Sequence, residues 1–199
     1  MSDRGTVLIG MDLQPAVVER NCSYAALAAA RRAVLAARAY GVGVIFVRTA
    51  FRPGYPEVSA RNAIFAPMAQ AADGAMTEDH PAAQIHPTLE ARPDEPVVLK
   101  RRVSAFSGSD LDTLLRAADA HTLVLTGVAT GGVVLSTLRQ AADLDYQLVV
   151  LSDACGDRDP EVHRLLIEKV FPRQATVLTT DEWIKTLQAD NWNGLTQQS

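Results

Sequence analysis

The sequence predicts an α/β protein built on a doubly wound, six-stranded and mostly parallel sheet with helices on both faces. Short apolar runs rich in β-branched residues are typical of strands that are buried on both faces. These runs alternate with helix-forming segments along the 199 residues, which favours βαβ units. Right-handed crossovers then favour the strand order 3-2-1-4-5-6. We expect a single domain over residues 1–199.

The individual elements follow from local patterns. Residues 24–40 are rich in Ala, Leu and Arg, and Gly41 follows as a favourable C-cap. Asp159 is a suitable N-cap for another helix, with Pro160 at its first position. Further helices are expected after Ser109 or Asp110, beyond Gly131-Gly132 and over residues 180–189. The predicted strands are residues 6–11, 42–49, 96–100, 122–127, 147–152 and 175–180.

Two regions lack such patterns. Residues 50–95 hold many of the prolines and show no clear periodicity, so we expect a long irregular excursion there. The polar tail from residue 191 onward is expected to be loose.

The composition excludes several classes of protein. A formal net charge of −4 disfavours binding to nucleic acid or to an anionic membrane. No apolar run approaches the roughly 18 residues of a spanning helix, and the N-terminus lacks a signal-peptide pattern. Cys22 and Cys155 form no CxxC pair, so no disulfide framework is expected. We expect a cytoplasmic protein whose partner is a small molecule.

Charged residues stand where predicted strands end on one edge of the sheet. Asp12 follows the first strand, Lys100 ends the third, and Gly131-Gly132 stand where the fourth turns into a helix. A carboxylate and an ammonium beside a helix N-terminus suit proton transfer and anion stabilisation. The plainer alternatives are a turn aspartate, a solvated lysine, and glycines that only permit close packing.

Motifs for nucleotides and metals are missing from the sequence. Gly131-Gly132 fit neither G-x-G-x-x-G nor G-x-x-x-x-G-K-[ST]. The four histidines are scattered, and no H-E-x-x-H occurs. We therefore expect no cofactor and no metal.

Four ordered segments resemble the isochorismatase-like hydrolase superfamily, the cysteine hydrolases. They are "VLIGMDLQ", "VVLKRRVSAFSGSDLDTLL", "LVLTGVATGGVVLSTLRQAADLDYQLVVLSDAC" and "ATVLTTDEWI". The resemblance extends from about Val7 to Ile184. It implies an isochorismatase-like α/β domain, hydrolase activity and a homo-oligomer.

The amidohydrolases of this family use an Asp, a Lys and a Cys, and the resemblance assigns Asp12 and Lys100 to the first two. The Cys position, three residues after Thr130 in a T-x-x-C-V-x-x-T pattern, is occupied by Val133. An isopropyl group cannot form a thioester, so covalent amide hydrolysis cannot proceed through this residue. Cys155, and with less support Cys22, is the alternative of a displaced nucleophile. We expect Asp12 and Lys100 at ion-pair distance, with Val133 facing them.

Another branch of the family offers chemistry that needs no thiol. Members that hydrolyse isochorismate have Gly at the Cys position and use the Asp as a general acid that protonates a vinyl ether. Isochorismate is a dicarboxylate, and Arg48, Arg52, Lys100 and Arg102 are available as anion partners, or Arg48 and Arg102 are solvated surface charges. The zinc-dependent branch has its ligands after strand two, where "VRTAFRPGYPEV" offers none.

Seven residues are expected to contact a substrate. Phe51, Tyr55 and Phe106 offer an apolar wall over a small substrate, with ordinary packing under a long loop as the alternative. The resemblance implies a cis peptide bond between Val128 and Ala129, beside the pocket. The seven are Gln14, Phe51, Arg52, Phe106, Val128, Ala129 and Thr130.

Two functions fit these residues. The first is a hydrolase of a small organic substrate in which Asp12 and Lys100 act without a Cys nucleophile. The alternative is a catalytically inactive family member, a pseudoenzyme that serves as a small-molecule-binding or oligomeric scaffold protein. Retention of the Asp and Lys favours the enzyme, whereas Val133 favours the pseudoenzyme.

Overall fold

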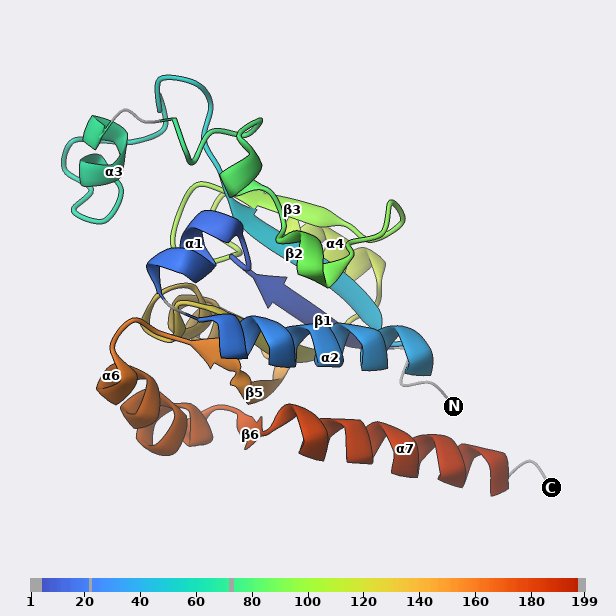
Figure 1. Ribbon diagram of the computed structural model, residues 1–199. Helices are drawn as coiled ribbons and strands as arrows, with labels where there is room; N and C mark the ends of the chain where they lie inside the picture. The colour runs from blue at the N-terminus through green and yellow to red at the C-terminus, as the bar shows by residue number, and fades with distance from the viewer. Residues whose placement is uncertain (1–4, 22, 72–73, 197–199) are drawn as a thin grey trace.

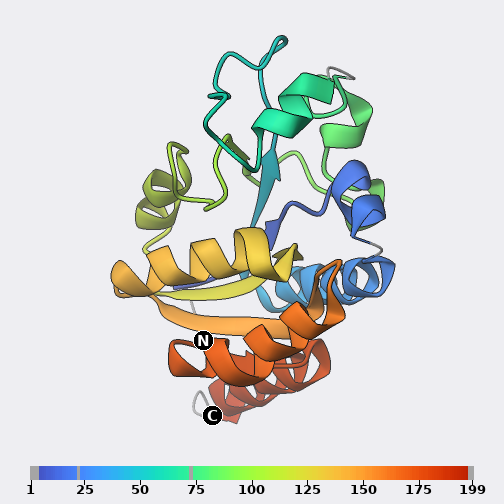
Figure 2. The same cartoon turned by 90° about the vertical axis from the view of Figure 1, so that its left-hand side faces the viewer.

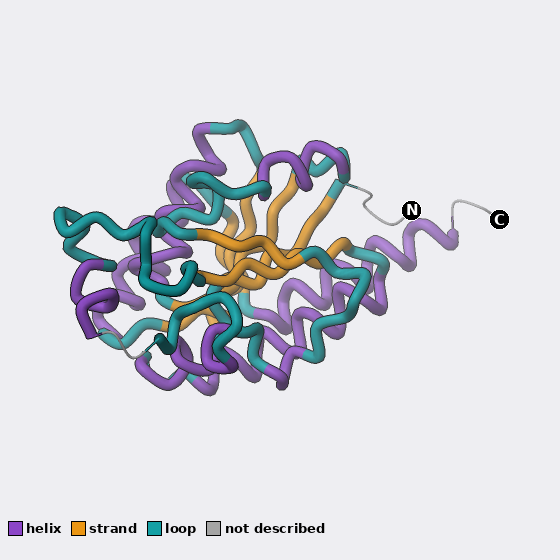
Figure 3. Tube along the Cα trace, turned by 90° about the horizontal axis from the view of Figure 1, so that it is seen from above, coloured by secondary structure: helices purple, strands orange, loops and turns teal. Residues whose placement is uncertain are grey.

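The computed structural model describes residues 5–21, 23–71 and 74–196 and contains one six-stranded sheet. All strand pairs are parallel, and the order is β3-β2-β1-β4-β5-β6, which confirms the predicted fold class. Figure 3 shows the strands lying between helices on two sides. The strands are β1 (Thr6–Met11), β2 (Gly43–Thr49), β3 (Val97–Lys100), β4 (Thr122–Val128), β5 (Gln147–Gly156) and β6 (Thr176–Leu178).

Helices cover both faces of the sheet (Figure 1). Helices α2 and α7 pack on one face, where Leu27 and Trp183 share a core with Leu8. Helices α4 and α5 pack on the other face. The helices are α1 (Pro15–Arg20), α2 (Tyr24–Tyr40), α3 (Ala66–Ala71), α4 (Leu111–Ala117), α5 (Leu135–Asp143), α6 (Pro160–Leu165) and α7 (Thr180–Thr196).

The central strand β1 shows why the sheet needs both helical layers. Every residue of β1 is buried. Because side chains alternate along a strand, Val7, Ile9 and Met11 enter the core beneath α4 and α5. Leu8, between them, enters the core beneath α2. An uninterrupted apolar run is therefore required, as the sequence predicted.

Helix ends agree with the capping residues in the sequence. Gly41 ends α2 with φ 71°, in the left-handed region that glycine adopts without steric cost. The Asp159 carboxylate accepts hydrogen bonds from the N–H groups of Glu161 and Val162, and Pro160 occupies the first turn of α6. These predictions are confirmed.

The excursion between β2 and β3 extends beyond the sheet (Figures 1 and 2). It contains α3 and short turns at Pro81–Ala83 and Pro87–Leu89. A single β-bridge joins Phe51 to Thr77 near its base. Its position beside the carboxyl ends of β1 and β2 makes it a wall of the site described below.

The C-terminal region differs from the prediction. Helix α7 continues to Thr196, so the expectation of a loose tail from residue 191 is wrong over residues 191–196. The low hydrophobicity of this stretch suggested a tail, but polar residues can continue a helix that tertiary contacts have already begun. Residues 197–199 lie outside the described part of the chain. Among the described residues, no helix is long and apolar enough to span a bilayer.

Candidate active site

The carboxyl ends of the central strands place Asp12 and Lys100 together. Asp12 follows β1, and its N–H donates to the carbonyl oxygen of Val47 at 2.8 Å, which extends the pairing of β1 with β2. Its φ of 52° lies in the left-handed region, which Asp enters more readily than most residues. Lys100 is the last residue of β3. The sheet itself therefore aims both side chains at one edge.

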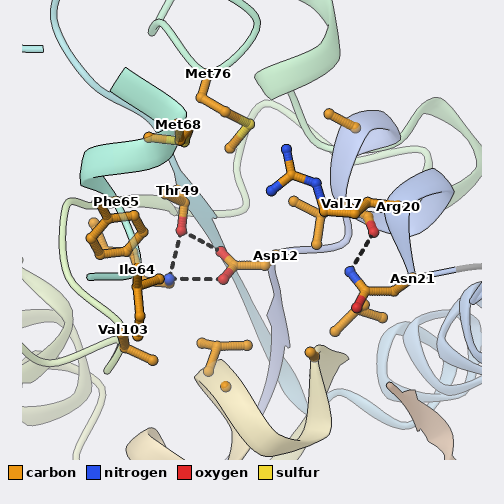
Figure 4. Close-up of a pocket in the computed structure, with 16 residues that line it drawn as sticks. Asp12, Val17, Arg20, Asn21, Thr49, Ile64, Phe65, Met68, Met76 and Val103 are labelled. Atoms are coloured by element: carbon orange, nitrogen blue, oxygen red, sulfur yellow. Dashed lines mark hydrogen bonds and ion pairs between the residues drawn. The ribbon is translucent and has the colours of Figure 1, made fainter. Parts of the chain in front are cut away.

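Asp12, Lys100 and Thr49 form a closed polar triangle (Figure 4). The Lys100 ammonium lies 2.7 Å from Asp12 Oδ2, so the expected ion pair is confirmed. Thr49 Oγ1 donates to Asp12 Oδ1 at 3.1 Å and accepts from Lys100 Nζ at 2.6 Å. Lys100 also donates to the carbonyl oxygen of Arg102 at 3.1 Å. These contacts hold the buried ammonium in one orientation.

Burial sets the protonation behaviour of this triangle. Removal of Asp12 from water raises the pKa of its carboxyl group, and the adjacent Lys100 ammonium opposes that rise without cancelling it. A carboxyl group with a raised pKa keeps its proton to higher pH, as a general acid requires.

A cavity of about 220 Å³ lies above the triangle. Its polar floor is formed by Asp12, Thr49 and Lys100, and most of its wall is apolar. A mostly apolar pocket with a few convergent polar groups is the usual form of a small-molecule site. The remaining lining residues are Ala16, Val17, Arg20, Asn21, Ile64, Phe65, Met68, Met76, Val103, Val128, Ala129, Gly132 and Val133.

The junction after β4 forms one side of this cavity. Residues Thr130–Val134 make a wide turn, kinked at Gly132 with φ −102° and ψ −105°, before α5 begins. Gly131 donates its N–H to Asp157 Oδ2 at 2.7 Å, which fixes the turn against the segment that follows β5. Val133 is buried and lines the cavity together with Asp12. The peptide bond between Val128 and Ala129 is cis, as expected.

Comparison with known proteins identifies the family. The isochorismatase domain profile matches residues 6–182. The chain belongs to the isochorismatase family. It is 31% identical to the isochorismatase family protein YwoC of Bacillus subtilis, over 92% of this chain and 94% of that protein. It is 30% identical to the ureidoacrylate amidohydrolase RutB of Stutzerimonas stutzeri, over 92% of this chain and 80% of that protein.

Solved structures agree with this assignment. An isochorismatase family protein from Burkholderia thailandensis superimposes with a TM-score of 0.81 at 27% identity, covering 94% of this chain and 97% of that one. A cysteine hydrolase from Pseudomonas syringae pv. phaseolicola superimposes with a TM-score of 0.84 at 23% identity, which supports the fold. The chain is thus a member of the isochorismatase family by sequence and by fold, with Val133 lining its cavity.

The structure separates the predicted substrate-binding residues into two groups. Val128 and Ala129 line the cavity beside the family positions Asp12, Lys100 and Val133. The other five, which do not line it, are Gln14, Phe51, Arg52, Phe106 and Thr130.

Two of those five hold the backbone that shapes the cavity. The Gln14 side-chain amide donates to the carbonyl oxygens of Thr49 at 2.9 Å and Ala83 at 2.7 Å, and accepts from the Thr49 N–H. Gln14 therefore positions the end of β2. Thr130 is buried, and its Oγ1 lies 2.8 Å from His163 Nδ1 in a hydrogen bond that ties the junction to α6.

The two aromatic residues and Arg52 lie farther from the floor. Phe51 packs edge-on against Phe65 with ring centroids 5.3 Å apart, so it supports a lining residue from behind. Arg52 pairs with Glu57 at 2.6 Å and is exposed. The expectation that Phe106 forms part of the apolar wall does not match its position, because its ring stacks on Tyr146 in the core beneath α5.

Other candidate groups are also accounted for. Arg48 donates hydrogen bonds to the carbonyl oxygens of Glu78 and Ala83. Arg102 donates to the carbonyl oxygens of Glu57 and Arg101. Both side chains therefore bind backbone of the excursion or next to it. Cys155 is buried outside the cavity lining, and burial raises the pKa of its thiol to about 12. A thiol in that state is a poor nucleophile at neutral pH. Cys22 lies outside the described residues.

Several lining residues had no signal in the sequence. Phe65, Met68 and Met76 belong to the irregular excursion, where periodicity gives no indication of which side chains face inward. Thr49 could have been found, because it ends β2 beside Asp12 in the sheet order. Within the described residues, no group of three or more His, Cys, Asp or Glu side chains is placed to hold a metal ion.

Proposed function

We propose that the chain hydrolyses a small organic substrate through Asp12 and Lys100, without a covalent intermediate at residue 133. The observation that carries this proposal is the buried Asp12–Lys100 pair on the floor of a cavity that Val133 also lines. The isochorismatase family supplies the hydrolase class, and the relative RutB acts on ureidoacrylate as an amidohydrolase. The valine removes the thiol but leaves the proton-transfer group in place.

In the proposed mechanism, Asp12 is the general acid. Its carboxyl group donates a proton to a vinyl ether carbon, and a water molecule adds to the resulting cation and gives up a proton, which restores the acid form of Asp12. The hemiketal then breaks down to a ketone and an alcohol, so one water is consumed in total. Lys100 and Thr49 hold the Asp12 carboxylate that remains after proton transfer. Val133 keeps the side of the cavity next to α5 apolar.

We expect kcat/KM for hydrolysis to decrease as pH rises through the raised pKa of Asp12. Burial raises this pKa, so the active, protonated form persists above the ordinary carboxyl range and is lost at higher pH. Loss of one proton predicts a decrease of about tenfold per pH unit on that limb. The measurement is a pH–rate profile with two substrates. Hydrolysis of isochorismate is monitored by the release of pyruvate, and hydrolysis of nicotinamide by the release of ammonia. A rate that increases with pH over the same range would assign Asp12 the role of a base.

The pseudoenzyme alternative rests on the same valine. A chain that binds small molecules in this cavity and hydrolyses neither class of substrate at any pH would be a binding or scaffold protein. The homo-oligomer and the cytoplasmic location stay predictions from the resemblance and the composition.

A further inference from the structure

The end of α1 contributes a cation to the rim of the cavity. Arg20 is the last residue of α1 and lines the same cavity as Asp12 and Lys100. Asn21 closes this turn, since its backbone N–H and its side-chain Nδ2 both donate to the carbonyl oxygen of Val17, at 3.2 and 2.8 Å. In Figure 4 the Arg20 guanidinium extends over the cavity on the side of Met76. The rim residue therefore has a fixed backbone and an exposed side chain that reaches over the cavity.

Three arginines around the excursion pair with acidic side chains, and Arg20 does not. Arg38 pairs with Glu95, Arg52 with Glu57, and Arg101 with Glu78. Arg20 has no ion pair or hydrogen bond with any residue that the structure describes. Its guanidinium donors are therefore free to bind a ligand in the cavity.

The charges that line the cavity favour a small anion. The Asp12–Lys100 pair at 2.7 Å carries no net negative charge whether Asp12 is protonated or ionised, and Arg20 adds a positive charge that no other lining residue offsets. A guanidinium is shaped for paired hydrogen bonds to a carboxylate. Between this cation and the floor the wall is apolar, formed by side chains of the excursion and of the segment after β3. These are Ile64, Phe65, Met68, Met76 and Val103.

We propose that Arg20 is a specificity-determining residue that binds the carboxylate of a small monoanion with an apolar body. The carboxylate lies at the rim, the body lies against the apolar wall, and the opposite end of the molecule reaches Asp12 and Lys100. The assignment of the reacting end rests on the proposed hydrolase function. The assignment of the carboxylate end rests on Arg20 and the shape of the cavity alone.

The test is binding of matched acids and amides, measured by isothermal titration calorimetry without any turnover. The probe pairs are benzoate with benzamide and isobutyrate with isobutyramide, which differ mainly in charge. We expect the wild-type protein to bind at least one acid about tenfold or more tightly than its amide, as a charge-assisted hydrogen bond implies. Arg20→Gln should remove that preference, and Arg20→Lys should retain part of it.

Arg173→Gln is the matched control. Arg173 is an exposed arginine before β6, at the amino-terminal edge of the sheet and outside the cavity lining. The Arg173→Gln variant changes the net charge of the protein by the same amount as Arg20→Gln, and it should leave the preference for acids over amides intact. Equal loss in both variants would indicate a general charge effect and overturn the proposal.

Two other results would also overturn it: no acid preference in the wild-type protein, or a preference that survives in Arg20→Gln. These outcomes are separate from failure of the proposed hydrolysis. A chain that binds acids through Arg20 but hydrolyses nothing would retain this inference and lose the catalytic one. A chain that hydrolyses substrates but shows no preference for acids over amides would retain the proposed hydrolase function and lose the inference about Arg20.

Discussion

Replacement of Asp12 by Asn is expected to lower kcat/KM for hydrolysis by about 10²–10⁴-fold, the range that a positioned acid contributes. Asn retains the shape of the side chain and can accept from Thr49, but it has no proton to donate at the required pKa. The decrease of activity at high pH should disappear from the residual rate. The measurement is the pH–rate profile of the purified variant beside wild type.

Two further variants keep this result interpretable. Asp12→Asn leaves the Lys100 ammonium buried without its counterion, which can destabilise the fold by about 3–5 kcal/mol. The double variant Asp12→Asn/Lys100→Gln leaves no unpaired charge, so it should fold and should be equally inactive. Asp143→Asn removes an exposed carboxylate at the end of α5 and should retain full activity. Activity within a fewfold of wild type in the folded double variant would contradict the role of Asp12.

Replacement of Val133 by Cys is expected to create a thiol that iodoacetamide labels, whereas no cysteine lines the cavity among the residues that the structure describes. Residue 133 lines the cavity with Lys100 and lies just before α5, and both a neighbouring ammonium and a helix N-terminus lower a thiol pKa. Cys155 should stay unlabelled, because its buried thiol has a pKa of about 12. The measurement is the mass of labelled peptides, in a Cys22→Ser background.

Val134→Cys is the matched control for this labelling. Val134 is the next residue along the turn, but it is fully buried in the core beneath α5 and does not line the cavity. Its thiol should remain inert in the folded protein. A folded Val133→Cys protein that is no more reactive than Val134→Cys would mean that residue 133 does not face the cavity.

The floor of the site could be predicted from the sequence because the sheet determines it. Asp12 follows β1 and Lys100 ends β3, two parallel strands on either side of β2, so both side chains lie at the same edge of the sheet. Val133 followed from its spacing after Thr130 in a family motif. Phe106 was expected to form part of the apolar wall over the substrate. In the structure the segment after β3 turns toward α4 and carries that ring into the core.

The walls could not be predicted in the same way. Phe65, Met68 and Met76 belong to a segment whose path depends on long-range ion pairs such as Arg101 with Glu57. Arg20 carried no signal of its own, because a basic residue in the last turn of a helix is favoured by the helix dipole whether or not it binds a ligand. Only the three-dimensional arrangement shows that it lines the cavity.

The central claim is that hydrolysis at this site needs Asp12 and no cysteine. The most direct measurement is kcat/KM of a chain with neither thiol, Cys22→Ser/Cys155→Ala, with its fold verified by circular dichroism. The account predicts that this protein hydrolyses the same substrate as wild type within about twofold, since neither thiol participates. Loss of the wild-type activity in the folded, thiol-free protein would contradict the account and assign the reaction to a displaced cysteine.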